Sequence, residues 1–429
     1  MNGWLLNAME RKMTTTDVVI PVLYGDEFEG ERVRGEEIYV ECGGGVTHAV
    51  EWVTSMAMDE VEDGRVEIIG PDLERIEPPG QLPFALVAEV AGLKMQQDFE
   101  PILERQIHHI INCVHGVMYN CQKDNVLVRI NRTAVEEGLR LFHLGKVLHA
   151  KFHEEFGTIF DKVQVKIYTD KEKVDQILVQ AKEVYQKRDA RLEGMTDENV
   201  DHFYSCTICQ SIAPSHVCVI SPERSGLCGA YNWMDCKTSH KINPYGPNQP
   251  IQKGEVIDSR LGQWKGVNEF VAKASYQKAE HYNLYSLIDN PTTTCSYCEC
   301  IATVLPLCNG VMSVNREYKD TTPCGMDFTI LVDLVARGEA TPGFVGHSKY
   351  NIIQRKWLIG EGGIKRLIWM PRMLKEEIAE RLKKRCEEIG MPDFIDRIAD
   401  ETIGETEEEI LPFLTKKNHP ALSMDLILG

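Results

Sequence analysis

The chain has 429 residues, of which 43% are hydrophobic and 26% are charged, and its formal net charge is −18. This length indicates two or three domains and this composition a soluble globular protein, whereas the negative charge argues against nucleic acid and membrane surfaces as partners. The sequence contains no run of 18 apolar residues and no basic start followed by an apolar stretch, so we expect neither a membrane span nor a secretory signal. Fourteen cysteines without such a signal predict a cytoplasmic protein whose thiols bind metal or stay reduced.

The first half of the chain predicts alternating strands and helices. We expect strands at 37–42, 65–70, 82–92 and 163–169, and helices at 47–56, 99–118 and 134–156. The first strand, helix and second strand together predict a βαβ unit. Thr169 is expected to cap the helix that follows, with Glu172 closing a capping box. These elements predict an α/β domain over residues 1–190.

A polar stretch at 188–201 predicts the linker to a second domain. Beyond it, short segments and turn signals predict an irregular, cysteine-rich α+β metal domain over residues 191–429. A late helix is expected at 371–389, with a buried stripe formed by Leu374, Ile378, Leu382, Cys386 and Ile389. The predicted fold class is therefore multidomain, α/β and α+β, with mixed sheets and helices.

Seven cysteines stand between positions 206 and 300. Four of them follow the spacing C-x2-C-x8-C-x9-C, namely Cys206, Cys209, Cys218 and Cys228. One C-x2-C pair followed by two single cysteines is typical of a cubane iron–sulfur cluster, whereas structural zinc usually shows two pairs or a late histidine pair. Zinc and unliganded thiols are the alternatives to an iron–sulfur cluster here.

A second group contains Cys295, Cys298 and Cys300. The tripeptide Cys298-Glu299-Cys300 suits tetrahedral zinc poorly, but two thiolates and two backbone amides can form a square plane around nickel or copper. The alternative is that these residues are merely buried thiols.

Three separated segments carry a resemblance to a known family. Residues 203–235 (FYSCTICQSIAPSHVCVISPERSGLCGAYNWMD), 292–318 and 360–372 resemble acetyl-CoA synthase, the β subunit of the acetyl-CoA decarbonylase/synthase complex. The resemblance implies an A-cluster, in which Cys206, Cys209, Cys218 and Cys228 bind a 4Fe–4S cluster and Cys209 bridges to a dinuclear nickel centre. It also implies a CO-methylating acyltransferase that assembles or cleaves acetyl-CoA. The substrates would be coenzyme A, a methyl group from a corrinoid iron–sulfur protein, and CO from a carbon monoxide dehydrogenase subunit.

The nickel segment departs from the family pattern Cys-Gly-Cys-Phe-Glu-Cys-Ile. In an ungapped register Cys295 takes the first nickel-ligand position and Tyr297 the second, whereas in another register Cys298 and Cys300 bind nickel. Cys209, Cys295, Cys298 and Cys300 are therefore the candidate catalytic residues. A non-catalytic iron–sulfur subunit, which transfers electrons or supports the fold, is the alternative function.

Other polar motifs are weaker. Gly43–Gly45 could bind a phosphate of coenzyme A, but a plain turn is favoured. His149 and His153, four residues apart on a predicted helix, could bind a metal ion, but a solvated face is favoured because no cysteine or carboxylate motif accompanies them. His216 could donate a hydrogen bond to a cluster sulfur or be structural.

Overall fold

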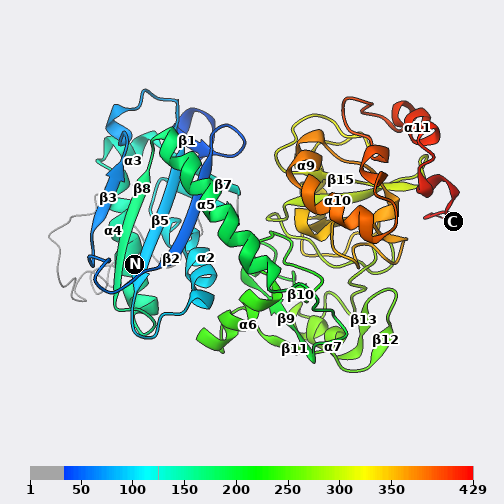
Figure 1. Cartoon of the computed structure of the whole chain (residues 1–429), viewed down its shortest axis with the longest axis horizontal. Helices are drawn as coiled ribbons and strands as arrows, with labels where there is room; N and C mark the ends of the chain where they lie inside the picture. Colours follow the sequence, from blue (N-terminus) through cyan, green and yellow to red (C-terminus); the bar gives the residue numbers. More distant parts are fainter. Residues whose placement is uncertain (1–32, 124, 429) are drawn as a thin grey trace. The chain divides into compact units, whose positions relative to one another are not determined.

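The computed structural model describes residues 33–428 with the exception of residue 124, and these residues form two compact units (Figure 1). Unit 1 comprises the described residues up to 95 together with 106–120 and 127–176. Unit 2 comprises 96–105, 121–126 and the described residues from 177 onwards. The division runs through helices α2 (Glu100–Ile111) and α5 (Lys171–Ala190). The domain boundary at residue 190 stays a prediction.

The main sheet of unit 1 has the strand order β2-β5-β8-β3. Its strands are β2 (Ala49–Ser55), β3 (Val66–Ile69), β5 (Phe84–Ala91) and β8 (Lys162–Tyr168). β5 pairs parallel with β2 and antiparallel with β8, and it is buried along its whole length. An almost continuous apolar run explains this central place, because a strand that is covered on both faces needs no polar alternation.

A second sheet in this part of the chain has the order β4-β1-β7-β6. Its strands are β1 (Ile38–Gly43), β4 (Gly80–Gln81), β6 (Val117–Gln122) and β7 (Asn125–Asn131). β1 confirms the strand predicted at 37–42, and β3, β5 and β8 confirm the other three predicted strands. The chain turns at the end of β1, where Gly43, Gly44 and Gly45 all have positive φ.

The predicted helix at 47–56, and the βαβ unit built on it, are wrong because this segment is strand β2. Val50, Val53 and Thr54 are β-branched, and their fit to a pleated surface beside β5 outweighs the helix-like spacing of the apolar residues. The predicted cap of α5 is also wrong. The Thr169 hydroxyl donates to the Pro71 carbonyl at 2.7 Å, and the Asp170 side chain instead accepts from the Lys173 N–H at 3.1 Å.

The helix predicted at 134–156 is two helices, α3 (Arg132–Glu136) and α4 (Leu141–Phe156). Gly138, with φ of +106°, lies between them and turns the chain. α4 packs against β3 and β8, and Gly145 lets the helix approach β3, because a Cβ at this position would lie 2.5 Å from Val66 Cγ1. The helix predicted at 99–118 is shorter and corresponds to α2.

Unit 2 contains three sheets. Their orders are β10-β9-β11, β12-β13 and β16-β14-β15-β17. The strands are β9 (His202–Cys206), β10 (Cys218–Ile220), β11 (Pro250–Gln252), β12 (Val256–Asp258), β13 (Gln263–Trp264), β14 (Cys300–Leu305), β15 (Gly310–Asn315), β16 (Phe344–His347) and β17 (Leu367–Trp369). β14 and β15 are completely buried, and they form the centre of the four-stranded sheet.

The helices of unit 2 lie around these sheets (Figure 1). Those that lie wholly within the described part of unit 2 are α6 (Trp233–Ile242), α7 (Lys265–Ala274), α8 (Phe328–Val335), α9 (Arg372–Glu377), α10 (Ala379–Glu388) and α11 (Glu407–Lys416). The helix predicted at 371–389 is divided into α9 and α10 at Ile378. Of its predicted stripe, Leu374, Ile378, Leu382 and Cys386 are buried, whereas Ile389 is only half-buried.

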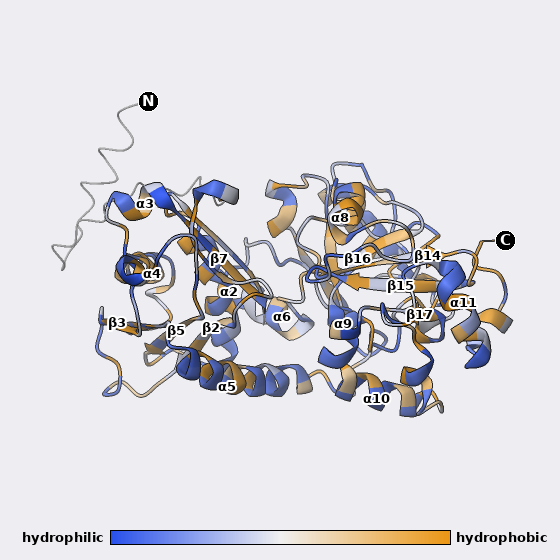
Figure 2. Ribbon diagram, turned by 90° about the horizontal axis from the view of Figure 1, so that it is seen from above, coloured by the Kyte–Doolittle hydropathy of each residue, from blue (hydrophilic) through white to orange (hydrophobic). Residues whose placement is uncertain are grey.

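Hydropathy distinguishes α5 from the central strands of the four-stranded sheet of unit 2. Figure 2 shows much of α5 coloured as hydrophilic, whereas the strands of the four-stranded sheet of unit 2 carry many hydrophobic residues. Across residues 33–428, leaving out 124, no helix has both the length and the apolar character needed to cross a membrane.

Candidate metal centre

Two predicted cluster ligands lie on neighbouring strands. β9 ends at Cys206 and β10 begins at Cys218, and the antiparallel register places these two cysteines directly opposite each other. Directly opposite residues have Cβ atoms about 4.5–5.5 Å apart on one face of the sheet. The connection between the strands contains a short 3-10 helix, Ile208–Ser211, which carries Cys209.

Cys228 comes from a tight turn. The Gly226 N–H donates to the Tyr231 carbonyl at 2.8 Å, and the Gly229 N–H donates to the Gly226 carbonyl at 2.9 Å. Gly229 has φ of +69°, and a Cβ at this position would lie 2.5 Å from Oε2 of Glu299. Glycine is therefore needed at position 229 both for the backbone conformation and for space.

Cys295 joins these four cysteines from a distant part of the sequence. The Cys209 thiol donates a hydrogen bond to the Cys295 sulfur. This bond holds the pKa of Cys295 well below its usual range despite burial, with the neighbouring His216 acting in the same direction, and it raises the pKa of Cys209. We refer to Cys206, Cys209, Cys218, Cys228 and Cys295 as the thiol group.

Crowding of sulfur atoms in a buried place makes several thiolates unfavourable at once. Burial, together with the nearby thiols, raises the pKa of Cys206 and raises that of Cys228 to about 12. Burial acts in the same direction on Cys218, but a hydrogen bond from His216 and the charge of Arg224 outweigh it and lower the pKa of that thiol. Bound metal cations would remove the repulsion among these sulfurs and keep them deprotonated.

His216 lies between two members of the thiol group. Its ring hydrogen-bonds Cys218 and Cys295, and its Nδ1 lies 2.9 Å from Thr293 Oγ1, which in turn lies 2.5 Å from the Tyr282 hydroxyl. Burial alone would lower the pKa of His216, but the two adjacent sulfurs raise it to about 10. The ring is therefore oriented from one side by oxygen and presents a proton to sulfur on the other.

Sequence reasoning missed the three threonines that precede Cys295. Arg224 Nη2 donates to Thr292 Oγ1 at 2.8 Å, Thr293 contacts His216, and Thr294 Oγ1 accepts from the Gly346 N–H at 2.8 Å. Each hydroxyl thus ties the segment entering Cys295 to a different element. A run of three threonines immediately before a cysteine was the available signal.

Glu299 was also missed as a positioning residue. Its carboxylate is buried and accepts hydrogen bonds from Ser348 Oγ at 2.6 Å and from the Lys349 N–H at 3.0 Å. Its own N–H donates to the Leu227 carbonyl at 3.0 Å, next to Cys228. Glu299 therefore links the turn of Cys228 to the segment that contains Cys295.

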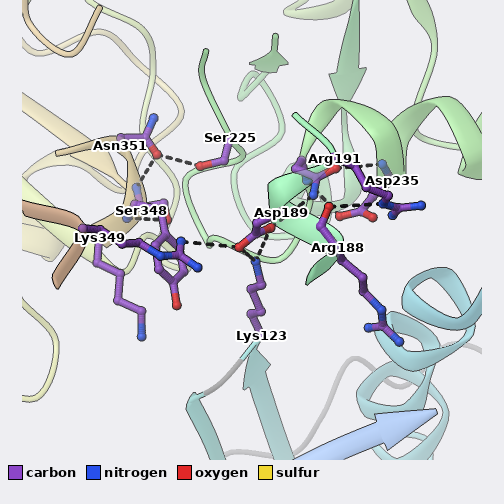
Figure 3. Close-up of polar contacts among 12 residues, drawn as sticks. Lys123, Arg188, Asp189, Arg191, Ser225, Asp235, Ser348, Lys349 and Asn351 are labelled. Carbon is purple, nitrogen blue, oxygen red and sulfur yellow. Dashed lines mark hydrogen bonds and ion pairs between the residues drawn. The ribbon is translucent and has the colours of Figure 1, made fainter. Parts of the chain in front are cut away.

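Polar contacts beside the cysteine turn support the same arrangement (Figure 3). Ser225 Oγ donates to Asn351 Oδ1 at 2.8 Å, so the start of the turn is fixed to the segment that binds Glu299. Nearby, Lys123 Nζ donates to both carboxylate oxygens of Asp189, at 2.7 and 2.6 Å, and Asn232 donates to the same carboxylate at 3.3 Å.

The structure buries Cys298 and Cys300 in different parts of the core. Cys298 packs in the cluster that contains Ile301 and Val314, and its sulfur faces Gly346, where a Cβ would lie 3.2 Å away. Cys300 begins β14 and packs in the other cluster. Burial raises the pKa of Cys298, and the negative charge of the nearby Cys295 thiolate raises it further.

A single tetrahedral zinc ion would hold its thiolate ligands close together. With Zn–S bonds of about 2.3 Å, a tetrahedral zinc ion holds its thiolates about 3.8 Å apart. Within the described part of the chain, the one set of three candidate ligand atoms that lie within 4.8 Å of one another is Asp63, His149 and His153, outside the thiol group. No three sulfurs of the thiol group, whose residues all lie in the described part of the chain, come that close to one another.

Comparisons with known proteins are consistent across the chain. Residues 185–428 match the family model for the C-terminal region of the ACS/CODH beta subunit, and residues 20–174 match that for the beta subunit of the CO dehydrogenase/acetyl-CoA synthase complex. The chain is 45% identical over 418 residues to the carbon monoxide dehydrogenase/acetyl-CoA synthase subunit alpha of Moorella thermoacetica, covering 97% of this chain and 57% of that relative. It is 41% identical over 404 residues to the acetyl-CoA decarbonylase/synthase complex subunit beta of Methanopyrus kandleri, covering 94% and 85% respectively.

A solved structure of the C-terminal domain of the acetyl-coenzyme A synthase alpha subunit is also similar. It is 44% identical in sequence, covers 31% of this chain and 99% of its own, and has a TM-score of 0.30.

Proposed function

Because the chain belongs to the β-subunit family of the carbon monoxide dehydrogenase/acetyl-CoA synthase complex, we propose that it is an acetyl-CoA synthase. The proposed reaction joins a methyl group, carbon monoxide and coenzyme A, or runs in the direction of acetyl-CoA cleavage. The proposed partners are a corrinoid iron–sulfur protein, which brings the methyl group, and a carbon monoxide dehydrogenase subunit, which brings CO, all in the cytoplasm. The chain spans only 57% of the length of the Moorella relative, so the activity and these partners are proposals.

The approach of Cys295 to the four cysteines of the cluster motif is the observation that carries this proposal. We infer that Cys206, Cys209, Cys218 and Cys228 bind a 4Fe–4S cluster, and that Cys209 and Cys295 bind nickel beside it. When bound, this A-cluster supplies the soft metal centre at which the methyl group and carbon monoxide combine. The hydrogen bond between Cys209 and Cys295 supports the inference, because it brings together one sulfur from each of the two cysteine groups.

The residues around the site have separate tasks in this proposal. His216 orients Cys295 and Cys218 by hydrogen bonds, and Arg224 and Glu299 hold the two cysteine segments in place. Burial of Cys206, Cys218 and Cys295 excludes water from the sulfur side of the site. By contrast, Ile212 is 43% exposed, so the loop that carries Cys209 has an accessible edge for incoming substrates.

The contacts of the thiol group favour the nickel register that begins at Cys295, with Cys298 and Cys300 as the alternative ligands. To test this, Cys295→Ser, Cys298→Ser and Cys300→Ser are compared after anaerobic reconstitution with iron, sulfide and nickel. We expect Cys295→Ser to lose nickel while keeping about four iron atoms per chain, and the other two variants to keep both metals. Cys386→Ser is the control, because this buried thiol lies in α10, outside both cysteine groups.

Activity is measured as exchange of labelled carbon monoxide with the carbonyl group of acetyl-CoA. The wild-type chain, reduced and loaded with nickel, should catalyse this exchange, and Cys295→Ser should not. A fully nickel-loaded and reduced wild-type preparation without exchange would contradict the proposal. Retention of nickel by Cys295→Ser with loss from Cys298→Ser and Cys300→Ser would instead establish the alternative register.

A non-catalytic iron–sulfur subunit is a second candidate, and Tyr297 favours it. In the ungapped register this phenol stands where the family has the second nickel thiolate, and oxygen is a harder donor than sulfur. Iron without nickel, after expression with nickel in excess, would support this second function.

A further inference from the structure

A separate set of metal-binding side chains lies in unit 1. His149 and His153 are one turn apart on α4, with ring centroids 4.7 Å apart, and Asp63 lies in the turn that precedes β3. One ligand atom from each of the three residues lies within 4.8 Å of the other two. The sequence favoured a solvated face for the two histidines because their carboxylate partner comes from 86 residues earlier in the chain than His149.

Two of the three distances between these ligand atoms are close to those of a tetrahedral metal site. Asp63 Oδ1 lies 3.1 Å from His149 Nε2 and 2.8 Å from His153 Nε2. Zinc bonds to nitrogen and oxygen of about 2.0–2.1 Å place neighbouring ligand atoms about 3.3 Å apart in a tetrahedron. The two observed distances would therefore change by about half an ångström or less on metal binding.

The carboxylate is held in place by the backbone around it. The Val163 N–H donates to Asp63 Oδ1 at 3.0 Å, and the Gly64 N–H donates to the Val163 carbonyl at 3.0 Å. Lys146, also on α4, donates to the Gly64 carbonyl at 2.6 Å. Carboxylates that bind metals are commonly oriented by such hydrogen bonds. The turn is thus fixed to both β8 and the helix that carries the histidines.

Partial exposure leaves room for a further ligand. The side chains of His149, His153 and Asp63 are 21%, 30% and 43% exposed. An open site with three protein ligands leaves one coordination position for water or a small molecule. The pair of His48 and Asp175 in the same unit differs, because a single imidazole, itself 58% exposed, meets the carboxylate there.

We propose that Asp63, His149 and His153 bind a divalent transition-metal ion of the zinc class, with a fourth position open to water. Two imidazoles and one carboxylate suit zinc and its neighbours in the first transition row, whereas magnesium and calcium prefer sites built from oxygen alone. This site contains no sulfur and does not depend on the proposed acetyl-CoA synthase activity.

Zinc binding is tested on the full chain after iron–sulfur reconstitution, so that the thiol group is occupied. The wild-type chain is compared with Asp63→Asn and with the double variant His149→Ala/His153→Ala, and His48→Ala is the matched control. We expect the wild type and the control to retain one more zinc ion per chain than the double variant by mass-spectrometric metal analysis. Asp63→Asn should weaken zinc binding about tenfold or more in competition with a chromophoric chelator.

X-ray absorption at the zinc edge provides an independent measurement. The additional zinc ion should show only nitrogen and oxygen neighbours, whereas zinc in the thiol group would show sulfur. Equal zinc content and affinity in the wild type and all variants, or sulfur around the additional zinc, would overturn the proposal. Asp63→Asn keeps the shape of the side chain, so it tests the site even if the double variant fails to fold.

Discussion

Substitution of Gly229 by alanine probes how the two cysteine segments are joined. Gly229 has φ of +69°, and the added Cβ would lie 2.5 Å from Glu299 Oε2, with the other carboxylate atoms of Glu299 also within 3 Å. The methyl group can only be accommodated if the carboxylate moves. That movement would break the hydrogen bonds that Glu299 accepts from Ser348 and Lys349.

The expected loss of stability has two parts. A left-handed backbone conformation costs a residue with a Cβ about 1–2 kcal/mol. Loss of hydrogen bonds to a buried charged group adds about 1–3 kcal/mol. We therefore expect Gly229→Ala to lower the free energy of unfolding by about 2–5 kcal/mol.

Gly325→Ala separates these two parts. Gly325 has φ of +80°, but no atom lies within 4 Å of the position of its Cβ, so only the backbone part, about 1–2 kcal/mol, applies. Urea unfolding of the metal-free chain, followed by fluorescence of the buried Trp233, Trp264 and Trp369, measures both variants. Equal midpoints for the two variants would refute the role of Glu299.

Two further outcomes are expected. Burial lowers the pKa of His419, whose Nε2 lies 3.1 Å from the Leu367 carbonyl, to about 4 in the folded chain. Since the pKa in the unfolded chain is about 6.5, the free energy of unfolding falls as the pH decreases through this interval. In urea titrations, the free energy of unfolding of His419→Asn should therefore fall by about 2 kcal/mol less than that of the wild type between pH 7 and pH 5. Arg224→Lys should lower the free energy of unfolding by about 2–4 kcal/mol in the same assay. The buried guanidinium donates hydrogen bonds to Thr292 Oγ1 and to the Val219 carbonyl from two different nitrogens, and a single ammonium group cannot reproduce both. An unchanged urea midpoint would contradict this.

Local patterns predicted four strands of the first half, but missed β4, β6 and β7 and misassigned β2. β1, β3, β5 and β8 were predicted because apolar and β-branched runs between turn signals specify strands locally. The segment of β2 was predicted as a helix, since its apolar residues also fit a helical period and its pairing with β5 is not visible in the sequence.

The sequence by itself determined the types of metal ligand and their spacing, because the order of cysteines along the chain is a covalent property. It also determined the family, through motifs in several separated segments of a chain that matches the family models over residues 20–174 and 185–428. Only the tertiary structure decided that Cys295 meets Cys209, that Glu299 lies against Gly229, and that Asp63 lies between two histidines of α4. Each of these contacts joins residues far apart in the chain, and such approach depends on strand register and packing of the whole core rather than on local sequence.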